Sequence, residues 1–595
     1  MKHFDIGSVT LDGGYLFTKQ ELNRKVTIDA VYDRFSETGR IGAFAHGYPD
    51  SDPIRPHYFW DSDVAKWIEG AAYSLKKHPD PVLESKVDAI VAEVEKNQHD
   101  DGYFNIYFTV VDPESRWKNR DWHELYCAGH LMEAAIAYHD ATGKRTLLDC
   151  MEKYADHIER VFVTDRSAEF LTPGHEEIEI ALIKMYRHTG KKKYLRLAEF
   201  FINKRGTEED VRRSDYNQSH LPVRQQTYAV GHAVRAVYLY TSMALLAAET
   251  PDAELVSACK TLWSDIVNGK MYVTGGIGST CIGEAFTSPY DLPNDQAYTE
   301  TCAGIGLAFF AQAMLCLENN SAYADVIERA LYNGILSGLS LDGKEFFYEN
   351  PLEINRSEYF KSTYGERRFP AQRRVGCFNC SCCPPNINRL LSSLGNYIFG
   401  FDNGTLYVNQ YASATLDNGG IKAKMTTQYP VDGVISVNAE GVSKIALRIP
   451  SWCDSFTINA PYVMENGYAV TEATDNVVLT LDMTPKTVWA DPRVLRDMSR
   501  VAVTRGPVVY CAEGIDNVDY ALHNYVLPDA PVFTEVEDRS GLVGLTVKCK
   551  RLVSRGGALY RYERPEAVDD TLKLIPYSSF ANREPSDMRV WFFSE

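Results

Sequence analysis

The densest group of reactive side chains in this sequence lies at residues 377–386, which read CFNCSCCPPN and hold four of the thirteen cysteines. Pro384 and Pro385 fix the backbone, so we expect a rigid loop here rather than a helix interior. Asn386 is then placed to cap a helix over about 386–400. Adjacent thiols before a helix N-terminus suit metal binding or thiolate chemistry, because the helix end and a metal both lower a thiol pKa. The alternative is a cluster of small buried hydrophobic residues.

A second group, Glu300 and Cys302, lies at the start of an apolar helical run. Inside a helix, residues i and i+2 point to different faces, but at an extended helix start they can converge on one ion. With Cys382 and Cys383 they would form a four-ligand oxygen and sulfur set, which suits tetrahedral zinc. The rival is a local zinc knuckle within residues 377–383, built on the Cys-x-x-Cys pair there. Spacing alone ranks the two sets about equal.

Glutamate and histidine side chains add to these candidates. Residues 274–284 are rich in glycine but match neither the P-loop nor the dinucleotide pattern. We interpret this stretch as a flexible loop that carries Glu284 to the site; the alternative is a solvated surface charge. Histidines follow a glycine at the start of three helical runs, and another precedes the first of these runs. They can line the mouth of a helical toroid and bind hydroxyl groups, whereas capping or core roles are the alternative. The four are His123, His130, His175 and His232.

The elements that must hold these groups are helical over most of the first 400 residues. Apolar residues recur at helical spacing in eleven segments, and several consecutive segments are separated by only a few residues. Such paired helices predict an α/α toroid, with an α-solenoid as the competing architecture. The segments are about 64–75, 82–98, 122–142, 146–161, 175–189, 192–204, 231–249, 252–268, 300–318, 322–338 and 386–400.

After about residue 405 the pattern changes to short strands separated by Gly, Asn, Asp and Pro. This pattern is typical of β-sandwiches, and the remaining length is enough for two small ones. The strand-like stretch 588–593 is predicted to return and pair with the first sandwich.

Composition excludes several classes of partner. The chain has 595 residues and a formal net charge of −18, which argues against nucleic acid or an anionic membrane as a partner. It has no run of about 18 apolar residues and no signal-peptide core at its first residues. The odd number of cysteines predicts free or metal-bound thiols in a reducing cytoplasm rather than a disulfide framework. Aromatic residues, 12% of the chain, agree with sugar binding only weakly.

Short motifs along nearly the whole chain resemble those of glycoside hydrolase family 127, the β-L-arabinofuranosidase family. Their order and rough spacing also fit that family. The motifs are Trp60-Asp61-Ser62-Asp63, Gln98-x-x-Asp101-Gly102-Tyr103, His123-Glu124-Leu125-Tyr126, Gly174-His175-Glu176-x-x-Glu179, Gly231-His232-Ala233-Val234-Arg235, Glu300-Thr301-Cys302 and Cys382-Cys383-Pro384-Pro385-Asn386.

The resemblance implies a fold and a set of roles. It implies an (α/α)6 barrel catalytic domain over 1–405, a β-sandwich over 406–495 plus 586–595, and a second β-sandwich over 496–585. It also implies Cys382 as the nucleophile and Glu284 as the general acid/base. The implied Zn2+ ligands are Glu300, Cys302, Cys382 and Cys383. The residues expected to contact the sugar are His123, His175, His232, Glu328 and Tyr348.

The function that this resemblance favours is a retaining exo-glycosidase that releases terminal β-L-arabinofuranose from oligosaccharides or glycoconjugates. A small carbohydrate would be its partner, and a homodimer is possible. Three alternatives remain: a glycosidase of the same fold that acts on another rare sugar, a different enzyme on the same toroid, such as an unsaturated-uronyl hydrolase or an epimerase, and a non-catalytic sugar-binding protein with a structural zinc.

Overall fold

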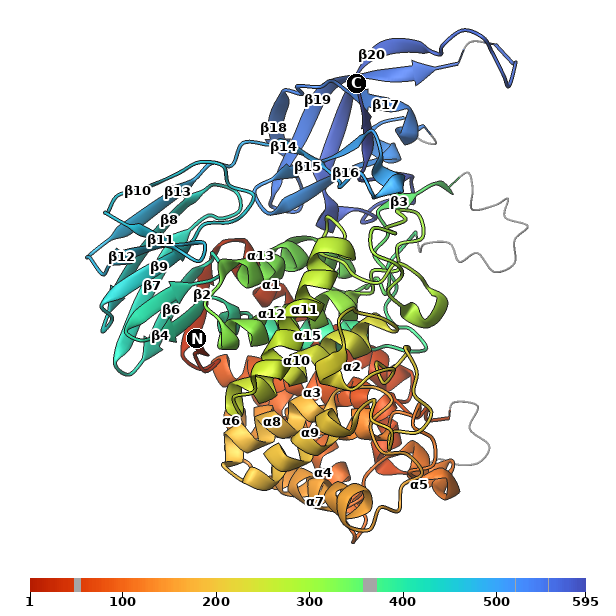
Figure 1. Ribbon diagram of the computed structural model, residues 1–595, viewed down its shortest axis with the longest axis vertical. Coiled ribbons are helices and arrows are strands. Elements are labelled where there is room, and N and C mark those ends of the chain that lie inside the picture. The colour runs from red at the N-terminus through yellow and green to blue at the C-terminus, as the bar shows by residue number, and fades with distance from the viewer. Residues whose placement is uncertain (48–54, 357–371, 519–520, 555) are drawn as a thin grey trace.

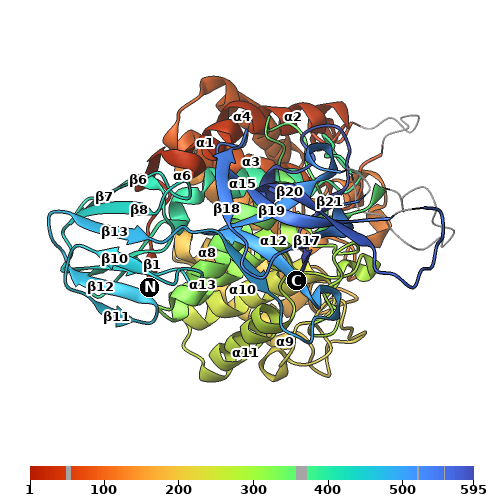
Figure 2. The same cartoon turned by 90° about the horizontal axis from the view of Figure 1, so that it is seen from above.

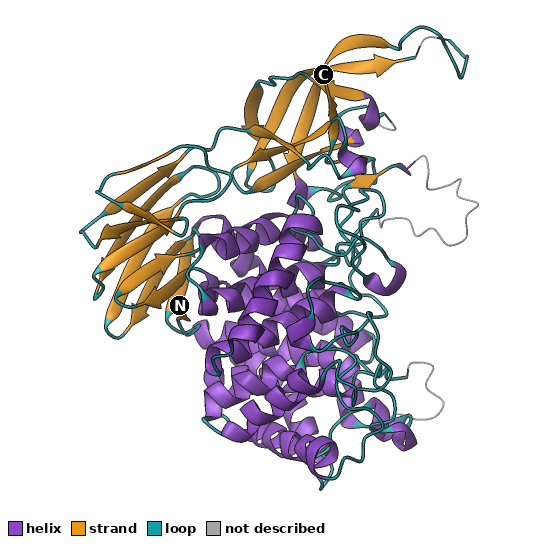
Figure 3. Ribbon diagram, in the orientation of Figure 1, coloured by secondary structure: helices purple, strands orange, loops and turns teal. Residues whose placement is uncertain are grey.

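A computed structural model describes residues 1–47, 55–356, 372–518, 521–554 and 556–595. Helices fill one end of the molecule and sheets the other, as Figures 1 and 3 show. The helices are α1 (Gly14–Leu22), α2 (Ile28–Glu37), α3 (Trp60–Lys77), α4 (Pro81–Asn97), α5 (Tyr107–Val110), α6 (Glu124–Thr142), α7 (Thr146–Glu159), α8 (Ile178–Thr189), α9 (Lys192–Lys204), α10 (Ala233–Glu249), α11 (Ala253–Gly269), α12 (Thr301–Leu317), α13 (Ser321–Ala330) and α15 (Cys383–Ser392).

Six of these helices, which we call the central helices, pack side by side in a closed order. The order is α3, α6, α8, α10, α12 and α15, and α15 returns to contact α3. Most residues of the central helices are buried, whereas α4, α7, α9 and α11 bury only one face, as surface helices do. Short turns join central to outer helices. For example, α6 and α8 end at Gly143 and Gly190, whose positive φ angles of 74° and 71° close each helix.

The strands form three sheets. Sheet one has the order β1-β4-β5-β9-β12-β11, sheet two β10-β13-β8-β7-β6-β2, and sheet three β14-β15-β22-β17-β19-β20-β16-β21-β3 with β18 beside β19. The strands are β1 (Lys2–His3), β2 (Val9–Gly13), β3 (Glu353–Ile354), β4 (Phe399–Asp402), β5 (Thr405–Val408), β6 (Ser413–Asn418), β7 (Ile421–Thr427), β8 (Val434–Glu440), β9 (Lys444–Arg448), β10 (Phe456–Ile458), β11 (Val463–Glu465), β12 (Tyr468–Glu472), β13 (Val477–Leu481), β14 (Lys486–Trp489), β15 (Arg500–Arg505), β16 (Val508–Glu513), β17 (Tyr525–Leu527), β18 (Phe533–Glu537), β19 (Val543–Val553), β20 (Glu566–Pro576), β21 (Met588–Arg589) and β22 (Phe592–Ser594).

The two ends of the chain pair differently from the sequence expectation. The C-terminal stretch does not return to the first sandwich, because β22 pairs with β15 and β17 of sheet three and β21 pairs with β16. The first strands instead leave the helical region, since β1 pairs with β4 and β2 with β6 (Figure 2 gives the view from above). Alternating residues show that a segment is a strand but not which strand it joins, so the pattern could not assign either pairing.

A buried ion pair fastens the helices to sheet one. Glu328 of α13 binds Arg448 of β9, and both side chains are almost fully buried. Tyr429 Oη donates to Glu328 Oε1 at 2.5 Å, and Trp452 Nε1 donates to Oε2 at 3.0 Å. Asp325 binds the same arginine. Both carboxylate oxygens of Glu328 therefore make contacts that join the helices to the sheet region.

We predict that Glu328→Gln lowers the free energy of unfolding by about 3 kcal/mol, because it leaves the buried Arg448 only partly neutralised. Urea unfolding followed by circular dichroism measures this. Glu37→Gln, which removes an exposed ion pair to Arg34, serves as the control and should change little. Equal small effects in both variants would contradict the fastening role.

Candidate active site

A pocket of about 150 Å³ lies where the central helices begin. Each central helix contributes residues from its first turn or from the segment just before it. Helix N-termini carry partial positive charge, so this arrangement favours anionic groups in the pocket. The lining residues are Tyr58, Phe59, Ser62, Asp63, His123, Tyr126, His175, Tyr216, His232, Val234, Arg235, Glu284, Glu300, Cys302, Tyr348, Cys380 and Cys382.

One oxygen and three sulfurs form a tight cluster at this pocket. Cys302 Sγ and Cys382 Sγ lie 3.4 Å and 3.8 Å from Cys383 Sγ. Glu300 Oε1 lies 3.4 Å from Cys382 Sγ and 3.6 Å from Cys383 Sγ. All four donor atoms are within 4.8 Å of one another. The structure thus brings together the ligand set that two distant sequence motifs predicted.

The spacing and chemistry of these donors fit a tetrahedral zinc ion. With Zn–S bonds of about 2.3 Å and a Zn–O bond of about 2.0 Å, tetrahedral geometry separates two sulfurs by about 3.8 Å and sulfur from oxygen by about 3.5 Å. In addition, Glu300 Oε2 is buried and has no hydrogen-bond partner among the described residues. Burial and the neighbouring Cys382 raise the pKa of Glu300 well above its usual value, and a bound cation would reverse this.

The protonation of Cys302 also suits a metal ligand. Burial raises the pKa of this thiol, but hydrogen bonds with Cys382 and Cys383 outweigh burial and lower it to about 6. Burial keeps the pKa of Cys383 high. Thiolate is the ligating form, so a metal would have to displace the proton from Cys383.

The rival ligand set within residues 377–383 is not assembled. Cys377 Sγ lies against Ser381 Oγ and the carbonyl of Phe378, outside the cluster. Cys380 lines the pocket and lies 3.9 Å from Tyr348 Oη, but it does not join the cluster either.

The helix after the double cysteine starts earlier than expected. Cys382 is the N-cap of α15, and Cys383 is its first residue. Asn386 is therefore not the cap; its side chain accepts from Arg389 Nε inside the helix. The two prolines fit because amide groups of a first turn have no partner within the helix. This places both thiols at the positive helix end.

Glu284 lies beside the cluster, at the end of the glycine-rich stretch and of the short 3-10 turn Ile282–Glu284. One of its oxygens lies within 4.8 Å of donor atoms of Glu300 and His232. His232 Nε2 lies 2.6 Å from Glu284 Oε2, and Tyr298 Oη donates to Oε1 at 2.5 Å. Burial raises the pKa of Glu284, but these two partners and the charge of Arg235 outweigh burial and lower it to about 2.

The glycine-rich stretch is packed rather than loose. A Cβ atom on Gly275 would lie 2.6 Å from the backbone nitrogen of Ala330, so glycine is needed for close approach. Glu284 itself has a φ of 53°, an unfavourable conformation for a residue with a side chain. The surrounding structure thus holds Glu284 in a strained position, as is often seen at functional sites.

Three of the four candidate histidines meet at the pocket. His123 and His232 are the N-caps of α6 and α10, and His175 lies in the segment before α8. Burial lowers the pKa of all three, so they are neutral and can donate to or accept from hydroxyl groups. His130 lies inside α6 and does not line the pocket.

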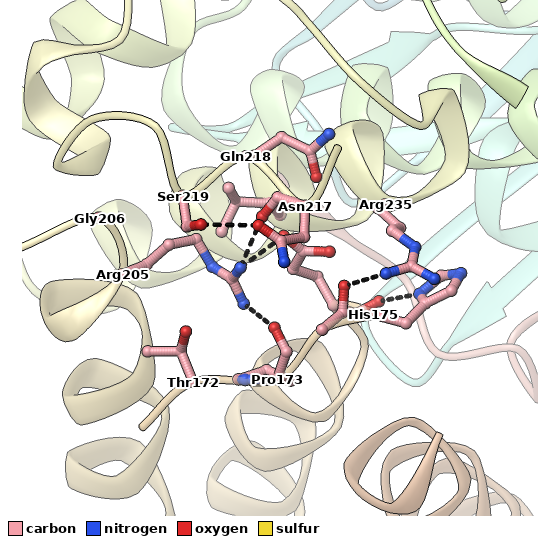
Figure 4. Close-up of polar contacts among 12 residues, drawn as sticks. Thr172, Pro173, His175, Arg205, Gly206, Asn217, Gln218, Ser219 and Arg235 are labelled. Carbon is pink, nitrogen blue, oxygen red and sulfur yellow. Dashed lines mark hydrogen bonds and ion pairs between the residues drawn. The ribbon is translucent and has the colours of Figure 1, made fainter. Parts of the chain in front are cut away.

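Buried arginines hold the segment that carries His175, as Figure 4 shows. Arg205 donates to the carbonyls of Pro173 and Asn217, both at 2.7 Å, and forms an ion pair with Glu176. Arg235 donates to the carbonyl of Gly174 at 2.5 Å. These contacts satisfy backbone carbonyls that would otherwise be buried without partners, and they fix His175 beside the pocket.

The two remaining predicted sugar contacts lie in different places. Tyr348 lies in the pocket, with Oη 3.3 Å from Cys382 Sγ. Glu328 does not line it, so we withdraw the predicted sugar contact in favour of the fastening role described above. Three residues at or beside the pocket were not among the predicted site residues: Tyr298, Tyr126 and Cys380. The signal that could have found them is that each lies close in the sequence to a motif residue or to a helix start.

Comparisons with known proteins agree with this geometry. The family pattern described as "Beta-L-arabinofuranosidase, GH127 catalytic domain" matches residues 8–396, and that of the "Glycoside hydrolase family 127 C-terminal domain" matches residues 485–593. The chain is 38% identical to a non-reducing end β-L-arabinofuranosidase of Bifidobacterium longum subsp. longum, covering 91% of this chain and 90% of that protein.

Solved structures of relatives share the whole architecture. A family 127 β-L-arabinofuranosidase from Geobacillus stearothermophilus T6 is 38% identical and superimposes with a TM-score of 0.93, covering 99% of this chain and 100% of that one. A second family 127 β-arabinofuranosidase, 35% identical, gives a TM-score of 0.90 over 100% of this chain and 98% of that one.

These relatives match nearly the whole chain, and the pocket is lined by carboxylate, thiol and histidine side chains. The protein is therefore a glycoside hydrolase. Its substrate is therefore a carbohydrate. The chain belongs to glycoside hydrolase family 127. Within the part of the chain that the structure describes, every helix is too short or too polar to cross a membrane.

We predict that Cys302→Ser lowers the bound metal to well under half of the wild-type content, because a thiolate ligand of the cluster is lost. Cys377→Ser is the matched control and should keep the full content, since its sulfur lies outside the cluster. Metal analysis by mass spectrometry of both purified variants decides. Loss of metal from Cys377→Ser instead would favour the local knuckle.

Proposed function

We propose that this protein is a retaining exo-glycosidase that releases terminal β-L-arabinofuranose. The observation that carries the proposal is Cys382 Sγ at a helix N-terminus, 3.4 Å from Glu300 Oε1, in the pocket that Glu284 also lines. The sugar is inferred from the relative named a non-reducing end β-L-arabinofuranosidase. The small pocket, below the roughly 300–1,000 Å³ of ordinary ligand sites, favours one terminal sugar unit.

The architecture proposed for this enzyme is an (α/α)6 barrel with two β-sandwich domains. The closed order of the central helices supports the barrel. The surface helices α4, α7, α9 and α11, which pack against the outside of this ring, support it as well. The pairing of the strands supports one change to the expected domain limits: β1 and β2 go with sheets one and two, and β21 and β22 with sheet three.

Zinc is the metal proposed for Glu300, Cys302, Cys382 and Cys383, because sulfur-rich tetrahedral sites suit it. When bound, zinc would keep the coordinated thiols deprotonated and so supply a thiolate nucleophile at neutral pH.

The chain's own residues then carry out two displacements. Cys382 Sγ attacks the anomeric carbon while Glu284 donates its proton to the departing oxygen, so a carbon–sulfur bond forms and the glycosidic bond breaks. Glu284, now a carboxylate, takes a proton from a water molecule that attacks the same carbon, and the electron pair returns to sulfur. Each displacement inverts the configuration, so the product retains it. In most retaining glycosidases a carboxylate occupies the place of this sulfur.

The acid role requires a protonated Glu284, although its partners hold its pKa at about 2. A zinc ion with three thiolates and one carboxylate carries two net negative charges, and nearby negative charge favours the neutral acid. Zinc binding would therefore favour both the deprotonated form of Cys382 and the protonated form of Glu284. Neutral His123, His175 and His232, together with Tyr348, are proposed to bind the sugar hydroxyl groups.

We predict that Cys382→Ser lowers kcat on p-nitrophenyl β-L-arabinofuranoside by at least about 10³-fold while the circular dichroism spectrum is unchanged, because the nucleophile is lost. Glu284→Gln should form the sugar–cysteine adduct with this activated leaving group but hydrolyse it slowly. Mass spectrometry of the Cys382 peptide would then detect a pentosyl adduct. Full activity of Cys382→Ser would favour a carboxylate mechanism. Sugar binding without turnover on any glycoside would favour a binding protein.

We predict that Tyr298→Phe shifts the alkaline limb of kcat/KM to higher pH. The phenol donates to Glu284 Oε1 and stabilises the carboxylate, so its loss raises the pKa of Glu284. A group needed in its protonated form then stays active to higher pH. The pH dependence of kcat/KM measures this, with Tyr216→Phe as the control, because among the described residues the hydroxyl of this pocket tyrosine makes no hydrogen bond to Glu284. An alkaline limb that moves down would contradict the assigned role.

A cytoplasmic location and a homodimer remain predictions. All thirteen cysteines, each within the described residues, are free thiols, which supports a reducing compartment.

A further inference from the structure

Tyr216 lies at the rim of the pocket and keeps part of its ring exposed. It lines the pocket, yet its exposed fraction is 37%. Glu300 and Cys302, which line the same pocket, are almost fully buried. The pocket therefore has its floor at the thiol cluster and its rim at this tyrosine. Aromatic side chains in such a place typically contact a ligand.

The Tyr216 ring lies on the side of the pocket that holds Glu284. Gly283 directly precedes Glu284, and a Cβ atom on Gly283 would lie 3.6 Å from Cδ2 of the ring. The ring centre of Tyr216 is 5.8 Å from that of His232, with the two planes at 77°. His232 Nε2 in turn lies 2.6 Å from Glu284 Oε2. Tyr216 is thus a neighbour of the group proposed to protonate the departing oxygen.

Arg235 covers one face of this ring. Its Cζ lies 4.3 Å from the ring centre, and the side chain is almost fully buried. Its Nη1 donates to the carbonyl of Gly174 at 2.5 Å and lies 3.9 Å from Asp121 Oδ1 (Figure 4). A guanidinium over an aromatic face is attracted by the electrons of the ring. The protein therefore occupies one face of Tyr216, and the opposite face is left for a ligand.

The backbone of Tyr216 is fixed as well. Its carbonyl accepts from the backbone nitrogen of His232 at 3.1 Å and from Gln218 Nε2 at 3.2 Å. A Cβ atom on Gly231 would lie 2.7 Å from Tyr216 Cα, so only glycine permits this close approach. The ring is thus held in place before any ligand arrives, which reduces the loss of conformational entropy on binding.

We propose that Tyr216, backed by Arg235, is the platform on which the leaving sugar stacks. The inference rests on the glycosidase function proposed above, in which Glu284 donates its proton to the departing oxygen. The leaving group must then lie beside Glu284. The pocket of about 150 Å³ favours one sugar unit, so the next unit lies at the rim, against the exposed face of the tyrosine.

This platform defines a class of substrate. The face of a sugar ring that carries C–H groups is apolar and flat enough to pack on a phenol ring. The substrates expected for this site are therefore oligosaccharides whose second unit is a sugar ring, in preference to glycosides of small alcohols. Tyr216 acts as a specificity-determining residue, because it touches the leaving sugar and takes no part in proton transfer.

The test compares two leaving groups. Methyl β-L-arabinofuranoside has no second ring, whereas a β-L-arabinofuranosyl disaccharide releases a second pentose. Chromatography of the released sugars gives kcat/KM for both substrates. We expect Tyr216→Ala to lower the ratio of the two kcat/KM values, disaccharide over methyl glycoside, by about tenfold, because the stacking contact is lost. A change of structure alone would affect both substrates and leave the ratio as it is.

Two control variants complete the design. Tyr216→Phe keeps the ring and should leave the ratio within about threefold of the wild type. Tyr228→Ala removes a tyrosine of similar exposure, 44%, that is not among the residues lining the pocket, and should not change the ratio. A folded Tyr216→Ala protein with the wild-type ratio overturns the proposal. If Tyr216→Ala does not fold, Tyr216→Leu decides, since it keeps apolar volume without a flat ring: a wild-type ratio in that variant also overturns it.

The same measurements separate this proposal from the proposed function. A wild-type protein that hydrolyses neither glycoside refutes the proposed function, and the platform with it. A wild-type protein that hydrolyses both glycosides, with an unchanged ratio in the alanine or leucine variant, refutes the platform alone.

Discussion

The convergence of the central helices at their N-terminal ends is the constraint on which the rest of this site depends. The pocket collects residues from the start of every one of them, and the aligned peptide dipoles make that place favourable for negative charge. The helix ends thus partly offset the unfavourable interaction between the carboxylate at the start of α12 and the two sulfurs at the start of α15. Pocket residues that are spread from Tyr58 to Cys382 in the sequence become neighbours, many of them because they lie at the start of a helix.

Buried polar contacts hold the starts of the central helices in fixed positions relative to one another. Arg389, about two turns beyond the thiols in α15, binds Glu69 of α3 and Glu133 of α6, and donates to Tyr238 of α10 at 2.9 Å. A single side chain thus ties α15 to three other central helices. Buried ion pairs of this kind contribute more to a unique arrangement than to net stability. This matters for the cluster of Glu300, Cys302, Cys382 and Cys383, because a set of donor atoms that could hold a metal tolerates little displacement.

How far the sequence could be interpreted depended on whether the information was local. Apolar spacing located eleven of the helices, but α1, α2 and α5 were not predicted. The start of α15 was placed three residues too late because its prolines were assigned to a loop rather than to a first turn. Spacing alone ranked Glu300, Cys302 and the double cysteine about equal to the local knuckle, and the family resemblance favoured the set that the structure brings together. Glu328 was misassigned because whether a charged residue faces a pocket or a sheet depends on packing between segments distant in sequence.

The pairing of β1 with β4 places the first residues of the chain beside residues made much later. Lys2 and His3 pair with Phe401 and Gly400, and β2 pairs with β6 a little further on. During synthesis at about 5–20 residues per second, the first strands wait roughly 20–80 s for these partners. An unpaired strand edge is prone to join other chains during that time. The short length of β1 and the charged or polar residues of β2 limit this hazard until the sheets can close.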